Sequence, residues 1–140
     1  MSDHVPTSQL NAIFKPSSIA VVGASTRAGT VGNDIFRNLL FNEFNGSVYP
    51  INPKANNVLG VHSYPDLLSV PGKVDLAVLI VPAAAVLQVV DQAIAKDVQS
   101  LVVISAGFKE IGGQGAELEQ QLRDKVRAAG IPLIGPNCLG

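Results

Sequence analysis

One segment of the chain combines residue types and spacing that suit chemistry, the small-residue stretch from Gly23 to Gly32. It carries a third glycine, Gly29, together with hydroxyl side chains and Arg27. Small residues let backbone N–H groups come close to an anion, and a helix that begins there adds the positive end of its dipole. The stretch therefore predicts a phosphate-binding loop. Because Ser25 stands where a GxGxxG pattern has its second glycine, a tight turn without a ligand is the alternative.

The end of the second apolar segment bears on which phosphate compound such a loop would hold. A domain that binds NAD has Asp or Glu at this point, where the carboxylate holds the ribose hydroxyls. This chain has Asn52-Pro53-Lys54 there and no acid. A lysine suits the phosphate beside the adenosine ribose, which NADP and coenzyme A both carry. The alternative interpretation of Lys54 is an ordinary surface lysine.

Side chains that could catalyse a reaction or bind a metal are scarce. The two histidines are His4 and His62, and the spacing suggests no Ser, Cys or carboxylate partner for either. No His/Cys cluster has the spacing of metal ligands. The single cysteine, Cys138, cannot form an internal disulfide. We therefore predict neither a catalytic residue nor a metal site in this chain.

The elements that must position these residues are predicted from the spacing of apolar side chains. Continuous apolar runs indicate buried strands, and apolar residues three and four apart indicate helices. Strands are expected at residues 19–22, 47–51, 58–64, 75–81, 101–105 and 131–134, and helices are expected after Gly32, Pro82 and Gly115. Strands that alternate with helices predict an α/β, Rossmann-like fold, an open, mainly parallel sheet of five or six strands with helices on both faces.

The domain organisation follows from length and composition. Residues 1–9 are polar and are expected to form a disordered tail, and residues 10–140 are expected to form one domain. The chain ends one loop after a strand, with no helix to cover that end of the sheet. We therefore expect it to be the first domain of a longer protein.

Composition also excludes several classes of protein. Hydrophobic residues make up 47% of the chain and charged residues 15%, which is incompatible with a disordered protein. The net charge is −1 and basic residues form no block, so nucleic acid is not an expected partner. The longest apolar stretch, residues 76–90, is short and interrupted by Pro82 and Gln88, so no membrane span is expected. With no signal peptide pattern at the N-terminus, a cytoplasmic location is predicted.

Six motifs occur in an order that identifies a family. They are Ser18–Ser25, Gly29–Gly32, Tyr49–Lys54, Val81–Ala83, Ile104–Glu110 and Gly135–Gly140. Together they closely resemble the N-terminal CoA-binding domain of NDP-forming acyl-CoA synthetases, which is related to the α subunit of succinyl-CoA synthetase. The resemblance covers about residues 10–140.

The resemblance implies a set of residues that bind coenzyme A. Ser25, Thr26 and Arg27 would line the site of the CoA nucleotide, and Lys54 would meet its phosphate-bearing end. Residues 81–82 and 105–108 would flank the adenine and the pantetheine arm, and Asn137 would lie near the thiol. The complete set is Gly23, Ser25, Thr26, Arg27, Gly29, Thr30, Val31, Gly32, Lys54, Val81, Pro82, Ser105, Ala106, Gly107, Phe108 and Asn137.

The resemblance also implies what the parent protein does. The synthetases form acyl-CoA through an acyl phosphate and a phosphorylated histidine of a later domain, with the nucleotide in an ATP-grasp domain. This chain contains neither part, so it is expected to bind CoA or acyl-CoA without catalysing a reaction alone. Its expected partners are the remaining domains of the parent. One alternative is a CoA-sensing domain of a synthetase-like protein lysine acetyltransferase, and a less favoured one is an NAD(P)-binding Rossmann domain.

Overall fold

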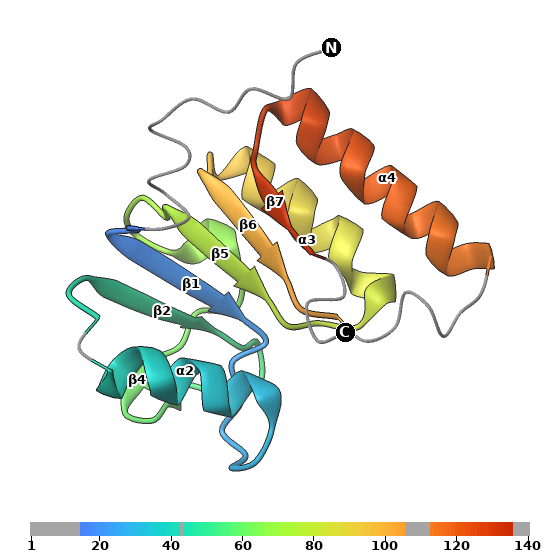
Figure 1. Ribbon diagram of the computed structural model, residues 1–140. Helices are drawn as coiled ribbons and strands as arrows, with labels where there is room; N and C mark the ends of the chain where they lie inside the picture. Colours follow the sequence, from blue (N-terminus) through green and yellow to red (C-terminus); the bar gives the residue numbers. More distant parts are fainter. Residues whose placement is uncertain (1–14, 43, 106–112, 136–140) are drawn as a thin grey trace.

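The computed structural model describes residues 15–42, 44–105 and 113–135. Strands and helices alternate along the chain, as the apolar runs predict (Figure 1). In chain order the elements are β1 (Ser18–Val22), α2 (Val31–Phe41), β2 (Ser47–Ile51), β3 (Asn57–Val58), β4 (Val61–His62), a 3₁₀ turn η1 (Leu67–Ser69), β5 (Leu76–Leu79), α3 (Ala83–Ala95), β6 (Ser100–Val103), α4 (Gly113–Ala129) and β7 (Leu133–Ile134).

The main sheet has five strands in the order β2-β1-β5-β6-β7, and every neighbouring pair is parallel. The chain leaves β1 to one side, toward β2, and later returns to the other side of β1 with β5. The order of strands therefore reverses between β1 and β5. In open α/β sheets, ligands bind in the crevice outside the carboxyl ends of the strands at such a reversal.

Different helices cover the two faces of the sheet (Figure 1). On one face, Ile19 and Val21 of β1 pack with Phe36 of α2 and with Val58 of the β3–β4 hairpin. On the other face, alternate residues of the same strands pack against apolar side chains of α3 and α4. All five residues of β1 are buried, which explains why the strand is a continuous run of apolar residues after Ser18. The predicted fold class is confirmed.

The structure corrects one predicted strand. Residues 58–64 do not add a strand to the main sheet; β3 and β4 instead form a two-stranded antiparallel hairpin beside it. The turn of the hairpin is Leu59-Gly60, with φ angles of 51° and 83°. Two consecutive positive φ angles are typical of a tight hairpin turn. One parallel bridge, between Ile51 and Tyr64, links this region to β2.

Other expectations differ only at their limits or lie outside the described residues. Helix α3 begins directly after Pro82, as expected, and Pro82 occupies its N-cap position. The last strand covers only two of the four residues expected for it. The predicted tail at residues 1–9 is outside the described ranges. Within those ranges, no helix is both long and apolar enough to cross a membrane.

Candidate functional site

Gly23 is the point where the carboxyl ends of three strands meet. Its N–H donates to the Ile51 carbonyl at the end of β2, at 3.1 Å, and the Ile80 N–H beyond β5 donates to the Val22 carbonyl, at 2.7 Å. A Cβ atom at residue 23 would lie 1.9 Å from the Ile80 carbonyl oxygen, and its φ is +98°. Both facts require glycine here. The small-residue loop therefore begins at the crevice between β1 and β5.

Gly32 and Gly29 serve the shape of the loop in different ways. A Cβ atom at Gly32 would lie 2.1 Å from the Gly23 carbonyl oxygen, so the first turn of α2 packs directly on the start of the loop. Glycine is therefore required at this position by the backbone of Gly23, and not by the approach of a ligand. Gly29 has open space around it and a φ of +86°, so glycine is favoured here by the conformation of the turn.

Thr30 caps helix α2. Its Oγ1 accepts a hydrogen bond from the Asn33 N–H at 3.3 Å and donates one to the Arg27 carbonyl at 2.8 Å. Ser, Thr, Asp and Asn are favoured at this position because a side-chain oxygen satisfies one free N–H of the first turn. The Thr30 hydroxyl, expected from the resemblance to meet a ligand, is thus engaged within the loop.

Several backbone donors of this region have no partner among the described residues. They are the N–H groups of Ser25 and Thr26 in the loop, and of Val31 and Gly32 in the first turn of α2. The Ser25 hydroxyl accepts from the Arg27 N–H at 3.0 Å, which folds the loop back on itself. Free N–H groups at the positive end of a helix dipole favour an anion. Thr26 and Arg27 are exposed, so the region is open to solvent.

The end of β2 is held against the loop by Asn52. Its Nδ2 donates to the Ala24 carbonyl at 2.9 Å, and its Oδ1 accepts from the Lys54 N–H at 2.8 Å. A carboxylate could not make the first of these bonds, because it has no hydrogen to donate. The structure thereby explains why the position lacks the acid typical of an NAD site. The Lys54 side chain is exposed and forms no ion pair with any described residue.

The ends of β5 and β6 complete this edge of the sheet. Val81 is half-buried. Pro82 has no polar side-chain atom, and no side chain of the described residues caps the N–H groups at the start of α3. Ser105 follows β6 and is 7% exposed, and its buried hydroxyl has no hydrogen-bond partner among the described residues. The other residues predicted here lie outside the described residues; they are Ala106, Gly107, Phe108 and Asn137.

The donors at the carboxyl edge fit a nucleotide with several phosphates. Arg27 and Lys54 pair with no acid in the described part of the chain, and the starts of α2 and α3 add uncapped or partly capped N–H groups. The orphaned Ser105 hydroxyl adds a polar atom that a ligand could satisfy. No group of residues that could hold a metal ion is found within the described ranges. Coenzyme A, with its pyrophosphate and 3′-phosphate, matches this donor set.

Sequence reasoning missed Asn33. This residue is 1% exposed, and its Nδ2 donates to the Ser25 carbonyl at 2.9 Å, while its Oδ1 has no partner in the described part of the chain. It lies three residues before Phe36 and seven before Leu40, on the buried face of α2. A polar residue at an apolar helical position was the available signal.

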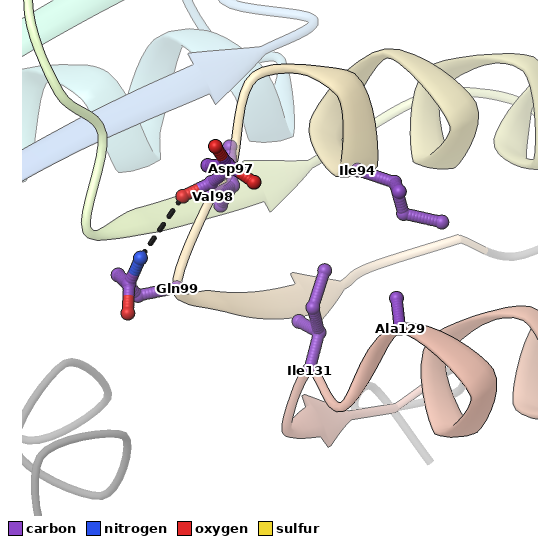
Figure 2. Close-up of a pocket in the computed structure, with 6 residues that line it drawn as sticks. All are labelled: Ile94, Asp97, Val98, Gln99, Ala129 and Ile131. Atoms are coloured by element: carbon purple, nitrogen blue, oxygen red, sulfur yellow. Dashed lines mark hydrogen bonds between the residues drawn. The ribbon is translucent and has the colours of Figure 1, made fainter.

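A depression lies at the opposite, amino end of the sheet, with a volume of about 240 Å³ (Figure 2). It is formed where α3 and α4 end and β6 and β7 begin. Its lining residues are Ile94, Asp97, Val98, Gln99, Ala129 and Ile131. The Gln99 amide donates to the Asp97 carbonyl at 3.0 Å, and no lysine or arginine lines the depression. Its chemistry does not suit an anionic ligand.

Comparison with known proteins agrees with the resemblance found in the sequence. The model of a family described as CoA binding domain matches residues 17–140. Acetate–CoA ligase (ADP-forming) I of Archaeoglobus fulgidus is 48% identical over 128 residues, 91% of this chain and 18% of the relative. The 4-hydroxybutyrate–CoA ligase (ADP-forming) of Nitrosopumilus maritimus is 41% identical over 128 residues, with the same shares.

A solved structure shares the fold. It is the dinucleotide forming acetyl-coenzyme A synthetase 1 of Ca. Korarchaeum cryptofilum, in complex with phosphate and ADP. Its TM-score is 0.87 at 45% identity, and the match covers 96% of this chain and 28% of that one. The chain thus spans less than a third of the proteins to which it is similar.

Proposed function

Because the chain belongs to the CoA binding domain family, we propose that it binds coenzyme A across the carboxyl ends of β1, β2, β5 and β6. The observation that carries this placement is the set of four N–H groups, of Ser25, Thr26, Val31 and Gly32, that have no partner among the described residues and lie at the reversal of strand order. The pyrophosphate would lie against these donors and the start of α2. Arg27 and Lys54 would add positive charge, with Lys54 at the 3′-phosphate.

The remaining predicted residues would serve the rest of the ligand. Val81 and Pro82 would flank the adenine. The buried hydroxyl of Ser105 would form a hydrogen bond with the ligand. Gly23, Gly29 and Thr30 would shape the loop without touching the reactive end. When bound, coenzyme A supplies a thiol that can accept an acyl group. The residues of this chain bind and orient it.

We propose further that the chain works as one part of an ADP-forming acid–CoA ligase. The relatives are ligases for acetate and for 4-hydroxybutyrate, and this chain matches both at 41% identity or more. A domain that is similar in ligases for different acids would bind the CoA, which these enzymes share, and not the acid. The acid, the nucleotide and the phosphohistidine would then belong to other domains or subunits, as in the NDP-forming synthetases. The acetyltransferase alternative and the NAD(P) alternative find no support among these relatives.

The test is a calorimetric titration of the 140-residue chain with CoA, dephospho-CoA and NAD. Replacing Lys54 by Ala should lower the affinity for CoA by about tenfold to a hundredfold, since a charge-assisted contact contributes about 1.5–3 kcal/mol. It should affect dephospho-CoA much less, because the partner phosphate is missing. The matched control is Lys73→Ala, an exposed lysine just before β5 at the amino end of the sheet, which should leave CoA affinity unchanged.

Two results would count against this assignment. If Lys54→Ala lowered the affinities for CoA and dephospho-CoA equally, Lys54 would not contact the 3′-phosphate. NAD binding more tightly than CoA to the unmodified chain would reject coenzyme A as the ligand.

A further inference from the structure

We propose that Asn33 and Asn52 are positioning residues for the phosphate loop, which turn two consecutive peptide groups so that their N–H donors face the ligand. The inference rests on the proposed binding of coenzyme A. It assigns a role to two side chains that need not contact the ligand themselves.

The first observation is that two asparagine amides hold two neighbouring carbonyls. Asn52, at the end of β2, donates from Nδ2 to the Ala24 carbonyl at 2.9 Å. Asn33, in the first turn of α2, donates from Nδ2 to the Ser25 carbonyl at 2.9 Å. The two amides come from different segments, the first turn of α2 and the residue after β2, and both segments follow the loop in the sequence. They fix the peptide groups 24–25 and 25–26.

The second observation concerns the other side of the same peptide groups. In a trans peptide, the carbonyl and the N–H point in opposite directions. The Ser25 N–H is therefore turned away from Asn52, and the Thr26 N–H is turned away from Asn33. Neither N–H has a partner among the described residues. The Ser25 nitrogen lies 3.4 Å from the position that a Gly32 Cβ would occupy, so it lies beside the first turn of α2.

One loop donor thus lies close to the donors of the helix. The Ser25 nitrogen lies beside the start of α2, where the N–H groups of Val31 and Gly32 also have no partner among the described residues. Successive N–H groups that point into one concavity bind anions. The two asparagine bonds hold the carbonyls of these peptide groups, which would repel a phosphate, away from the ligand.

The third observation is that Asn33 is an unfavourable choice for stability alone. The residue is 1% exposed, and its buried Oδ1 forms no hydrogen bond with any described residue. An unsatisfied buried acceptor destabilises the fold, and an apolar side chain would avoid that cost. The bond from Nδ2 to the loop is what an apolar replacement would lose. A functional demand on the loop therefore explains why an asparagine stands here.

The experiment compares Asn33→Ala and Asn52→Ala with the unmodified 140-residue chain. The matched control is Asn38→Ala, an exposed asparagine on the same helix α2. Affinities for CoA and dephospho-CoA are measured by calorimetry, and thermal unfolding by circular dichroism. The amide resonances of residues 25 and 26 are followed by ¹⁵N NMR during titration with CoA.

We expect each test variant to bind CoA and dephospho-CoA about tenfold more weakly, by the same factor for both, since both carry the pyrophosphate. The unfolding midpoint of Asn33→Ala should not fall, and the resonances of Ser25 and Thr26 should shift less on ligand addition. The control should behave as the unmodified chain.

Two results would overturn the inference while leaving the proposed function intact. In one, both variants bind CoA within twofold of the unmodified chain. In the other, the loss of affinity only follows the fraction of unfolded protein. A different result, in which the unmodified chain fails to bind CoA, would reject the proposed function itself. Because Asn52→Ala tests the second carbonyl independently, the inference stays testable if Asn33→Ala does not fold.

Discussion

The two ends of the parallel sheet differ in their hydrogen-bond donors. At the carboxyl end, the loop and the start of α2 leave N–H groups unpaired among the described residues, and Arg27 and Lys54 are free of acidic partners there. At the amino end, the depression of Figure 2 is hollow, but its backbone donors are used. The N–H groups of Asp97 and Val98 bond to carbonyls of the last turn of α3, at 3.1 and 3.0 Å.

Helix dipoles increase this difference. The helices α2 and α3 begin at the carboxyl end of the sheet, which therefore receives the positive ends of their dipoles. The amino end receives the negative ends of α3 and α4, together with the carboxylate of Asp97. A concave surface is thus not enough to identify the site of an anionic ligand. The supply of unpaired donors and positive charge is the better criterion.

The largest expected effect comes from breaking the junction at the carboxyl end. Gly23→Ala should lower the free energy of unfolding by about 3 kcal/mol or more, because the new Cβ would meet the Ile80 carbonyl oxygen at 1.9 Å. That is a large part of the stability of a typical domain. Chemical denaturation measures it.

The matched control is Gly29→Ala, in the same loop. Its φ of +86° is also unfavourable for alanine, but nothing lies within 4 Å of the new Cβ. Only the conformational cost of about 1–2 kcal/mol is expected. If the two variants proved equally stable, the view of Gly23 as a junction of three strand ends would be wrong.

A smaller effect is expected from the cap of α2. Thr30→Ala should lower the free energy of unfolding by about 1 kcal/mol in the absence of ligand, since the bonds to Asn33 and Arg27 are lost. It should also lower the affinity for CoA severalfold, because the loop would be held less firmly. Thr30→Ser keeps the hydroxyl and should restore both properties. A variant that lost affinity without losing stability would instead assign the Thr30 hydroxyl to direct contact with the ligand.

The carboxyl end could be predicted in outline from the sequence because its signals are local. Gly23, Gly29 and the hydroxyl residues stand in one short stretch, between an apolar run and a helical pattern. The run at residues 75–81 predicts a strand covered on both faces, and β5 is indeed central in the sheet. Lys54 could be singled out because it follows the next strand directly. The roles of these residues in binding stay predictions.

What could not be predicted depends on contacts between distant segments. The Asn52 amide meets a carbonyl 28 positions earlier, and nothing in the local pattern identifies that partner. Likewise, residues 58–64 have the composition of a strand, yet their pairing as a hairpin beside β2 is decided by tertiary packing of Val58. The spacing of apolar residues predicts which residues are buried, but it does not predict which atoms they contact.

The smallest expected effect tests the amino end. Asp97 follows the C-cap of α3 with a φ of +60° and places a carboxylate at the negative end of the helix dipole. Asp97→Asn should raise the free energy of unfolding by about 0.3–1 kcal/mol, because asparagine tolerates the left-handed conformation and carries no charge. Asp97→Ala removes the same charge but tolerates that conformation less well, so it should stabilise less. Thermal unfolding measures both, and CoA affinity should stay unchanged in each. A change in CoA affinity in either variant would show that the amino end takes part in binding, and the contrast between the two ends would fail.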